Sequence, residues 1–416
     1  MRLLLALALL FLASLSPAAD WPVWRGPKGD GVITDSVVPV KWSATENVAW
    51  KAEVLGLGHS SPIVSAGRVF LTSFVPDTQD RVLLCFDRKD GKLLWRKTVL
   101  TAAPEQLHKN NTPASSTPAA DGSHVWVTFL HGQKITVACH DFSSKQVWLK
   151  TFDGFESPHG FCGTPVLFED LVIINGDSDG DAFLAGLDRK TGETRWKTER
   201  PNRTRSFSTP LFIEVSGKTQ MVLAGSKSVA AFDPKTGKQE WVVDSATDKF
   251  AATAAFADGI VFATGTSPAN TLVGIKPDGT GNLTKTHVLW SDTRGAAYVP
   301  SPLGFGKHFF VLSDNGIATL LEAKTGKVVW SERLGSRLHR ASPLLINDLI
   351  YCLADDGQMF VLKAGAEFEV VGKSAIGEEC HATPAVSDGQ LFIRSTTHLW
   401  CIGRKVAAGA GGKNYP

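Results

Sequence analysis

Cationic side chains recur near one position of a repeating sequence pattern, and they are the residues best suited to hold a ligand. They lie just before the short segments that open each repeat, or in the connections leading into them: His59, Lys109, His159, Arg203, Arg205, Arg340 and His381. Arginine offers an anion a rigid fork of donors, and histidine titrates near neutral pH or binds a metal. We therefore predict a site for an anionic or polar ligand where these segments meet. The alternative is that exposed loop ends are polar in any protein and that nothing binds there.

Motifs for catalysis or metal binding are weak. The run DSDGD (177–181) looks like the start of a calcium loop, but the bidentate acid that such a loop needs at its twelfth position would be Asp188, at a hairpin turn. The same turn reads SDNG (313–316) and ADDG (354–357) elsewhere, so turn chemistry explains it better. Nothing resembles a GxSxG nucleophile elbow, because the one such string, GDSDG (176–180), belongs to this same turn, and the chain has no HExxH motif and no glycine-rich phosphate loop. We predict no catalytic residue and no metal site.

Cysteine usage and net charge argue against two further classes of protein, disulfide-framework proteins and nucleic-acid-binding proteins. The six cysteines include no adjacent pair and no CxxC, and in so long a chain they favour buried free thiols over a disulfide framework: Cys85, Cys139, Cys162, Cys352, Cys380 and Cys401. The formal net charge of +2 indicates no surface for nucleic acid.

A repeated hairpin supplies the elements that would position the candidate residues. The stretch AFDPKTGKQEW (231–241) recurs as CFDRKDGKLLW (85–95), GLDRKTGETRW (186–196) and LLEAKTGKVVW (320–330). Asp begins a tight turn, Gly accepts the positive φ that closes it, and the second strand ends on Trp. We predict that the tryptophans at this position pack one repeat against the next and take no part in chemistry: Trp50, Trp95, Trp148, Trp196, Trp241, Trp290 and Trp330.

The opening segments give the number of repeats. Each is a small residue followed by Pro or Ala, and a turn and further β-rich runs come after it: SSPIV (60–64), STPAA (116–120), GTPVL (163–167), STPLF (208–212), ATAAF (252–256), PSPLG (300–304), ASPLL (341–345) and ATPAV (382–386). Four short strands per unit of about 40–50 residues are typical of a propeller blade. The sequence thus predicts an all-β, eight-bladed β-propeller of four-stranded antiparallel blades.

The two ends of the repeat region complement each other. The last unit stops at HLWCIGRK (398–405) without its fourth strand, while ENVAWKAEV (46–54) is a strand with no partner and carries Trp50. We predict that this N-terminal strand closes the last blade, which satisfies its open edge. The expected domains are a signal peptide (1–19), an N-terminal strap (20–45), the propeller (46–405) and a flexible tail (406–416).

The first residues are typical of an export signal. One basic residue precedes an apolar run from Leu3 to Leu15, and small residues follow up to Ala19. A membrane anchor is the alternative, but the run is shorter than the ~20 residues that a spanning helix needs. We expect an exported protein, periplasmic or secreted, with no stable membrane span after cleavage.

The hairpins resemble a known repeat. The pattern A-x-D-x-x-T-G-x-x-x-W, over roughly residues 46–405, resembles the pyrroloquinoline-quinone (PQQ) type propeller repeat, which builds the eight-bladed quinoprotein alcohol dehydrogenases and the outer-membrane assembly factor BamB. The strap sequence DWPVWRGPKGDG (20–31) also resembles the opening of exported BamB-like propellers. The resemblance implies a BamB-like propeller of the bacterial envelope.

Two functions follow from this resemblance. The first is a non-catalytic scaffold, monomeric and without a cofactor, that binds an envelope protein or a small polar ligand. The alternative is a PQQ-dependent dehydrogenase with calcium. The resemblance to such enzymes implies a vicinal cysteine pair against the quinone, a Glu/Asn/Asp calcium site and a catalytic Asp. The sequence has no adjacent cysteines, so the scaffold is the preferred interpretation.

Overall fold

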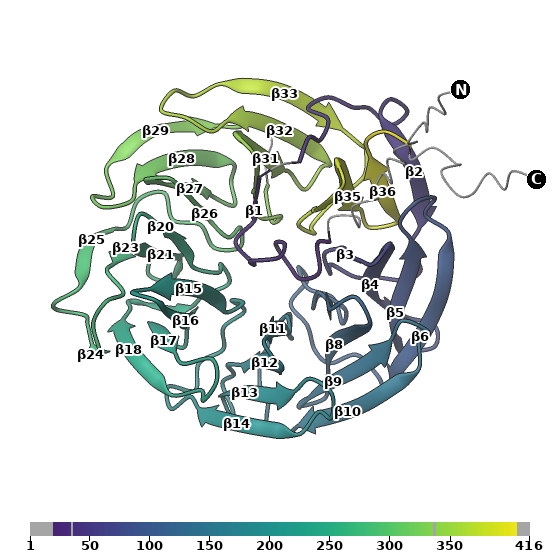
Figure 1. The fold of residues 1–416 in the computed structure, drawn as a ribbon, viewed down its shortest axis with the longest axis horizontal. Helices are drawn as coiled ribbons and strands as arrows, with labels where there is room; N and C mark the ends of the chain where they lie inside the picture. The colour runs from purple at the N-terminus through teal and green to yellow at the C-terminus, as the bar shows by residue number, and fades with distance from the viewer. Residues whose placement is uncertain (1–19, 35, 336–337, 406–416) are drawn as a thin grey trace, which may run out of the picture.

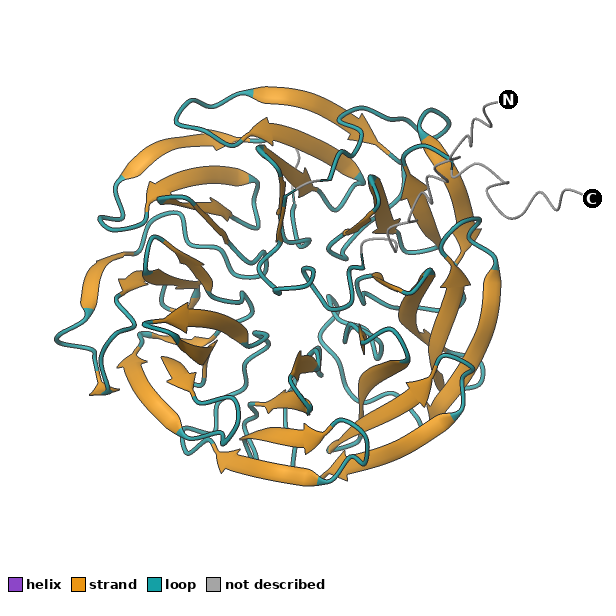
Figure 2. Ribbon diagram, viewed as in Figure 1, coloured by secondary structure: helices purple, strands orange, loops and turns teal. Residues whose placement is uncertain are grey.

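The computed structural model describes residues 20–34, 36–335 and 338–405, so the predicted signal peptide and tail lie outside the described residues. Eight small antiparallel sheets stand in a ring around a central channel (Figure 1). Strands and loops make up the whole described part of the chain, and Figure 2 displays this composition. The described part accordingly contains no helix long and apolar enough to span a membrane. The predicted all-β, eight-bladed propeller is confirmed.

The strands of each blade follow one another outward from the channel. Blade 1 consists of β3 (Ile63–Ser65), β4 (Arg68–Val75), β5 (Asp80–Asp87) and β6 (Leu93–Thr101), and blade 2 of β7 (Ala119–Ala120), β8 (His124–His131), β9 (Lys134–Asp141) and β10 (Gln146–Phe152). Blade 3 consists of β11 (Val166–Phe168), β12 (Leu171–Gly176), β13 (Phe183–Asp188) and β14 (Thr194–Glu199), and blade 4 of β15 (Leu211–Val215), β16 (Lys218–Gly225), β17 (Ser228–Phe232) and β18 (Gln239–Asp244).

Blades 5 to 8 repeat this order. Blade 5 consists of β20 (Ala255–Ala257), β21 (Ile260–Gly265), β23 (Thr271–Ile275) and β25 (Val288–Asp292), and blade 6 of β26 (Leu303–Phe305), β27 (His308–Leu312), β28 (Ile317–Glu322) and β29 (Val328–Arg333). Blade 7 consists of β30 (Leu344–Ile346), β31 (Leu349–Leu353), β32 (Gln358–Lys363) and β33 (Val370–Ala375), and blade 8 of β34 (Ala385–Ser387), β35 (Gln390–Arg394), β36 (His398–Ile402) and β2 (Val48–Glu53). Short accessory strands are β1 (Val32–Ile33), β19 (Thr247–Lys249), β22 (Ser267–Pro268) and β24 (Gly281–Asn282).

The N-terminal strand closes the ring as predicted. β2 pairs antiparallel with β36, and Trp50 stands opposite Cys401. The Trp50 indole donates to the Arg88 carbonyl at 2.9 Å and lies against Gly91, in the hairpin turn of blade 1. A Cβ on Gly91 would lie 2.5 Å from this ring, so the turn glycine makes room for the neighbouring tryptophan as well as allowing φ of +75°.

The same contact joins most neighbouring blades. The indoles of Trp148 and Trp290 donate to carbonyls of the next blade, at Arg189 and Ala323, and both rings lie on a turn glycine. Blade 4 departs from this pattern, because β24 pairs with the outer edge of β18 and Trp241 donates instead to the Gln220 side chain.

The strap crosses the middle of the ring in Figure 1, and its anchors lie beside the turns that join the inner strand of a blade to its second strand. Trp21 forms an antiparallel bridge with Val64 of blade 1, and β1 pairs in parallel with β30 of blade 7. Between these anchors the fully buried Arg25 donates to the Pro302 carbonyl at 2.6 Å. Burial lowers the pKa of Arg25 to about 10. We call this end of the channel the strap end.

Candidate functional site

All seven predicted ligand residues lie in connections that run from the outer strand of one blade to the inner strand of the next. These connections reach the same end of the channel, which we call the mouth. The seven residues separate there into two clusters and two isolated side chains.

The first cluster joins blades 1, 7 and 8. The rings of His59 and His381 meet edge to face, with centroids 4.5 Å apart, and His381 Nδ1 lies 3.4 Å from Arg340 Nη1. Desolvation lowers the pKa of His59 to about 3, and the nearby His381, Arg394 and Arg340 add to the shift. His59 is therefore a neutral group at neutral pH.

The second cluster contains His159 and Arg205. His159 stacks on His108 with a centroid distance of 5.3 Å, and desolvation, followed by the charge of Arg205, lowers its pKa. The two remaining residues stand apart: Lys109 is exposed, and Arg203 is exposed with a loose pair, 3.8 Å, to Asp181. The mouth thus carries both partly buried, closely paired cations and exposed ones.

Carboxylates engage the buried cations. Arg340 donates to Asp355 through both its guanidinium and its backbone N–H, the latter at 3.0 Å. Arg205 binds Asp179 in the same two ways, again with a backbone distance of 3.0 Å. Neither acid is among the predicted site residues, although Asp179 lies in the turn motif DSDGD and Asp355 in ADDG.

The motif DSDGD, which resembles the start of a calcium loop, also pairs its acids with arginines. Asp177 pairs with the buried Arg200 at 2.8 Å, and Asp179 pairs with Arg205. Each acid therefore has a guanidinium as its partner. Within the described ranges, no group of three or more His, Cys, Asp or Glu residues is placed to hold a metal ion.

A ring of hydroxyls lies below the mouth, where each blade's inner strand begins. The residue before the opening Pro or its equivalent is always Ser or Thr: Ser61, Thr117, Thr164, Thr209, Thr253, Ser301, Ser342 and Thr383. We call this ring the hydroxyl belt. In five of the eight steps the backbone N–H of one member donates to the hydroxyl of the next blade's member, at 2.9–3.0 Å. These bonds tie neighbouring inner strands together.

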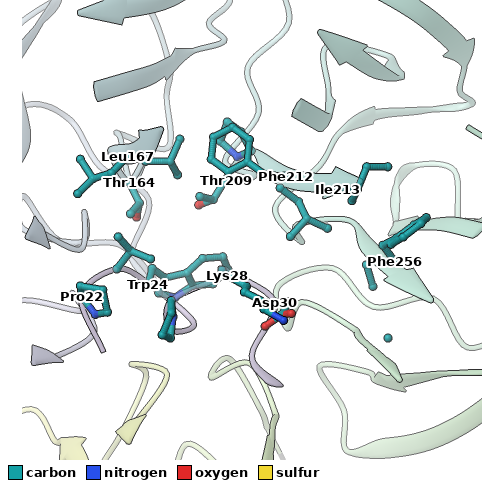
Figure 3. A pocket seen from close by; sticks show the side chains of 18 of the residues that line it. Pro22, Trp24, Lys28, Asp30, Thr164, Leu167, Thr209, Phe212, Ile213 and Phe256 are labelled. Carbon is teal, nitrogen blue, oxygen red and sulfur yellow. The ribbon is translucent and has the colours of Figure 1, made fainter. Parts of the chain in front are cut away.

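The belt is interrupted at blades 3 and 4. The hydroxyls of Thr164 and Thr209 receive no such bond within the described residues, although both side chains are more than nine-tenths buried. The hydroxyl of Ser61 in blade 1 is the third that receives no hydrogen bond from a neighbouring member of the belt. Figure 3 shows both threonine hydroxyls pointing toward Trp24 and Lys28 of the strap.

A cavity of about 570 Å³ lies between this part of the belt and the strap. Its apolar wall comprises Trp24, Leu167, Phe212, Ile213 and Phe256, and its charged groups are Lys28, Asp30 and Glu214 (Figure 3). We call it the strap cavity. The volume falls in the ~300–1,000 Å³ range of small-ligand sites. Sequence reasoning missed it, and the Ser/Thr before each opening Pro was the signal that pointed to the belt above it.

The fold defines the class of protein, an eight-bladed propeller of the PQQ-repeat type whose blades are joined through tryptophans. The family model described as outer membrane protein assembly factor BamB matches residues 32–115, 79–269 and 283–366, which is more than half of the chain. The chain belongs to this family.

Relatives carry two kinds of name. A polyvinylalcohol dehydrogenase of Pseudomonas sp is 25% identical over 46% of this chain and 30% of its own length. The outer membrane protein assembly factor BamB of Shewanella oneidensis is 25% identical over 40% of this chain and 42% of its own length. The chain therefore matches less than half the length of either relative.

Solved structures divide in the same way. BamB from Moraxella catarrhalis superposes with a TM-score of 0.56 at 14% identity, covering 84% of this chain and 95% of that one. The quinohemoprotein alcohol dehydrogenase from Comamonas testosteroni gives a TM-score of 0.66 at 12% identity, covering 96% of this chain and 83% of that one. At these identities the likeness concerns the fold alone.

Proposed function

We propose that this chain is an exported, non-catalytic scaffold of the cell envelope, and that its mouth binds an acidic segment of a protein partner. The family supports an envelope role, because its model is described as an outer membrane protein assembly factor. The apolar N-terminal run with its small-residue exit supports export.

The observation that carries the proposal is the pairing of three of the mouth's cationic or titratable groups with carboxylates. Arg340 is bound to Asp355, Arg205 is bound to Asp179, and His381 Nε2 lies 3.2 Å from Glu379. A general acid or base needs a group free to reach its substrate. Groups locked in pairs instead hold a rigid surface in shape.

Two of the exposed charges on this surface are cationic, and they stand beside the exposed acids Asp181 and Glu379. Lys109 has no ion pair within the described residues, and the side chain of Arg203 is 68% exposed. Exposed cations around a rigid rim steer an acidic partner and fix its register, an effect that salt weakens.

A quinoprotein dehydrogenase is the second candidate, because a relative and a structural neighbour carry dehydrogenase names. A PQQ–calcium centre would need a set of oxygen donors for the ion. Asp314 lies at the mouth and burial raises its pKa, but its two oxygens accept the backbone N–H groups of Tyr298 and Val299. The engagement of Asp314 by these two N–H groups supports the scaffold over such a centre. Absorbance spectra and dye-linked alcohol oxidation, with added PQQ and calcium, test this candidate, and a stoichiometric chromophore with turnover would replace the scaffold proposal.

The scaffold proposal is tested by cross-linking in envelope extract. The variant Lys109→Glu with Arg203→Glu reverses two exposed mouth charges, and Lys89→Glu with Lys92→Glu makes the same change in an exposed hairpin turn at the strap end. We expect one protein to be captured by the wild type and by the hairpin variant, and its capture by the mouth variant to fall roughly tenfold. Equal capture by all three proteins, or no specific capture by the wild type, would refute the proposal.

A further inference from the structure

We propose that the strap cavity is a second binding site, and that it takes a short, extended, apolar peptide segment of a partner protein. The peptide would add as a strand along the channel-facing edge of β15 in blade 4. This site lies below the hydroxyl belt and does not depend on the proposed function of the mouth.

The cavity follows the edge of a strand. Its lining includes four consecutive residues of β15, from Leu211 to Glu214. Successive side chains of a strand point to opposite faces, so a cavity over one face would touch every second residue only. A cavity that touches all four residues runs along the backbone edge. β15 pairs with β16 on its other side, and no described strand pairs with it on the channel side.

The strap itself shows how a peptide sits on such edges. In blade 1 Trp21 exchanges two backbone hydrogen bonds with Val64, at 2.8 and 2.9 Å. In blade 2 the Ala120 N–H donates to the Pro22 carbonyl at 2.8 Å. In blade 7 the residues of β1 pair in parallel with β30. The inner strands of these blades thus already carry an extended chain, while β15 offers the same edge next to an open space.

Two hydroxyls face this space without a protein partner. Thr164 and Thr209 are 6% and 7% exposed as whole residues, and their hydroxyls make no hydrogen bond within the described residues. Both residues line the open space of the cavity, so a peptide N–H or carbonyl that enters it can bond to these hydroxyls. Figure 3 places both groups on one side of the cavity, opposite the strap.

The lining defines the chemistry of the occupant. Trp24, Phe212 and Phe256 supply aromatic surface, and Leu167 and Ile213 supply aliphatic surface. Besides the two hydroxyls, the side chains that offer polar groups are Lys28, Asp30 and Glu214, two of which are exposed. A sugar or nucleotide would lose more hydrogen bonds to water than these groups could replace, whereas a peptide with apolar side chains meets its polar needs through its backbone.

The test uses a probe taken from the strap. Acetyl-Gly-Val-Ile-Thr-amide carries the sequence of residues 31–34, which includes the strand seated on β30. Its binding is measured by isothermal titration calorimetry, with acetyl-Gly-Asn-Asn-Thr-amide as the polar control peptide. We expect the apolar peptide to bind and the control to bind at least tenfold more weakly, because the wall is apolar.

Matched variants locate the site. Thr164→Val with Thr209→Val keeps the shape and removes the two free hydroxyls, so we expect binding to weaken about tenfold. Thr383→Val makes the same change at a belt position outside the cavity and should leave the affinity unchanged. If the double variant does not fold, Leu167→Trp, which fills the cavity from its half-buried wall, takes its place.

Absence of binding to the wild type, equal binding of the two peptides, or full affinity in the double variant or its replacement would overturn the proposal. Binding of a small non-peptide molecule alone would also overturn it. Capture at the mouth is measured with the Lys109 and Arg203 variants, so either proposal can fail while the other stands.

Discussion

The two ends of the central channel use polar groups in opposite ways. At the mouth charged side chains are bound to one another, as in the pair Arg340–Asp355 and the pair Arg205–Asp179. At the strap end the wall is apolar, and the hydroxyls of Thr164 and Thr209 face the cavity with no partner within the described residues. The hydroxyl belt separates the two regions.

The difference shows that polarity alone does not locate a binding site. A buried charge is tolerated only when it is paired, so a cluster of paired charges mainly reports how the connections are held. A hydroxyl that lines a cavity and has no protein partner is free to bond to a ligand. The strap end is therefore the better candidate for a snug ligand, and the mouth for a charged surface contact.

Removal of a strap anchor should have the largest effect on stability. Trp21 is 1% exposed and its ring packs over Gly26, so Trp21→Ala should lower the free energy of unfolding by about 3–5 kcal/mol. Trp24→Ala, at the half-buried cavity wall, should cost much less but abolish peptide binding. Urea denaturation of both variants checks the prediction, and equal destabilisation would mean that the strap is not anchored through Trp21.

Acid should destabilise the mouth through His59. Its pKa is about 3 in the folded protein against an ordinary value of 6.5, so the unfolded chain binds more protons between these two pH values. Stability is thus retained above pH 6.5 and lost as the pH falls toward 3, by about 2 kcal/mol at pH 5 for this one group.

The variant His59→Gln isolates this contribution. Its free energy of unfolding should depend less on pH between 6.5 and 4 than that of the wild type, although His140, with a pKa lowered by burial to about 4, keeps part of the slope. Identical pH profiles of the two proteins in urea denaturation would show that His59 is not desolvated.

Breaking a mouth pair should cost less than losing Trp21. Asp355→Ala leaves Arg340 without its carboxylate, but Arg340 is 24% exposed and water compensates in part, so we expect a loss of about 2 kcal/mol. Lys109→Ala, at an exposed position, should change stability by less than about 0.5 kcal/mol. Thermal unfolding measures both, and a neutral Asp355→Ala would mean that the pair does not hold the connection.

The smallest expected difference in stability is between belt hydroxyls that accept a hydrogen bond from a neighbouring blade and those that do not. Thr383→Val removes the acceptor for the Ser342 N–H, which is buried, and should cost about 1 kcal/mol. Thr164→Val removes a hydroxyl without a partner and should be neutral or slightly stabilising. If the two variants lose equal stability in urea denaturation, the Thr164 hydroxyl makes a stabilising hydrogen bond in the folded protein, and the distinction between the two positions is wrong.

The sequence predicted the fold in detail because the fold repeats. The hairpin that ends in Trp241 recurs often enough to count the blades, and the missing last arm pointed to Trp50 as the closing residue. The mouth was predicted in part: equivalent repeat positions brought His59, Arg340 and His381 together, but their acidic partners lie in turns whose approach no local pattern reveals.

The strap cavity could not be predicted from the repeats. It depends on the path of residues 20–33 across the channel, which follows no periodicity and is set by individual contacts such as Trp21 with Val64 and Arg25 with Pro302. The belt hydroxyls are visible in the sequence, but their bonded and free members look alike there.

The most direct test of the difference between the two ends is amide hydrogen exchange, measured with and without saturating acetyl-Gly-Val-Ile-Thr-amide. A peptide added to β15 would protect every second amide of residues 211–215, namely those that point away from β16, with smaller changes at 166–168 of β11. Mouth amides such as those of Arg340 and Arg205, which are already bonded to Asp355 and Asp179, should not change. Protection at the mouth alone, or none in β15, would contradict the assignment of the strap end as the peptide-binding end.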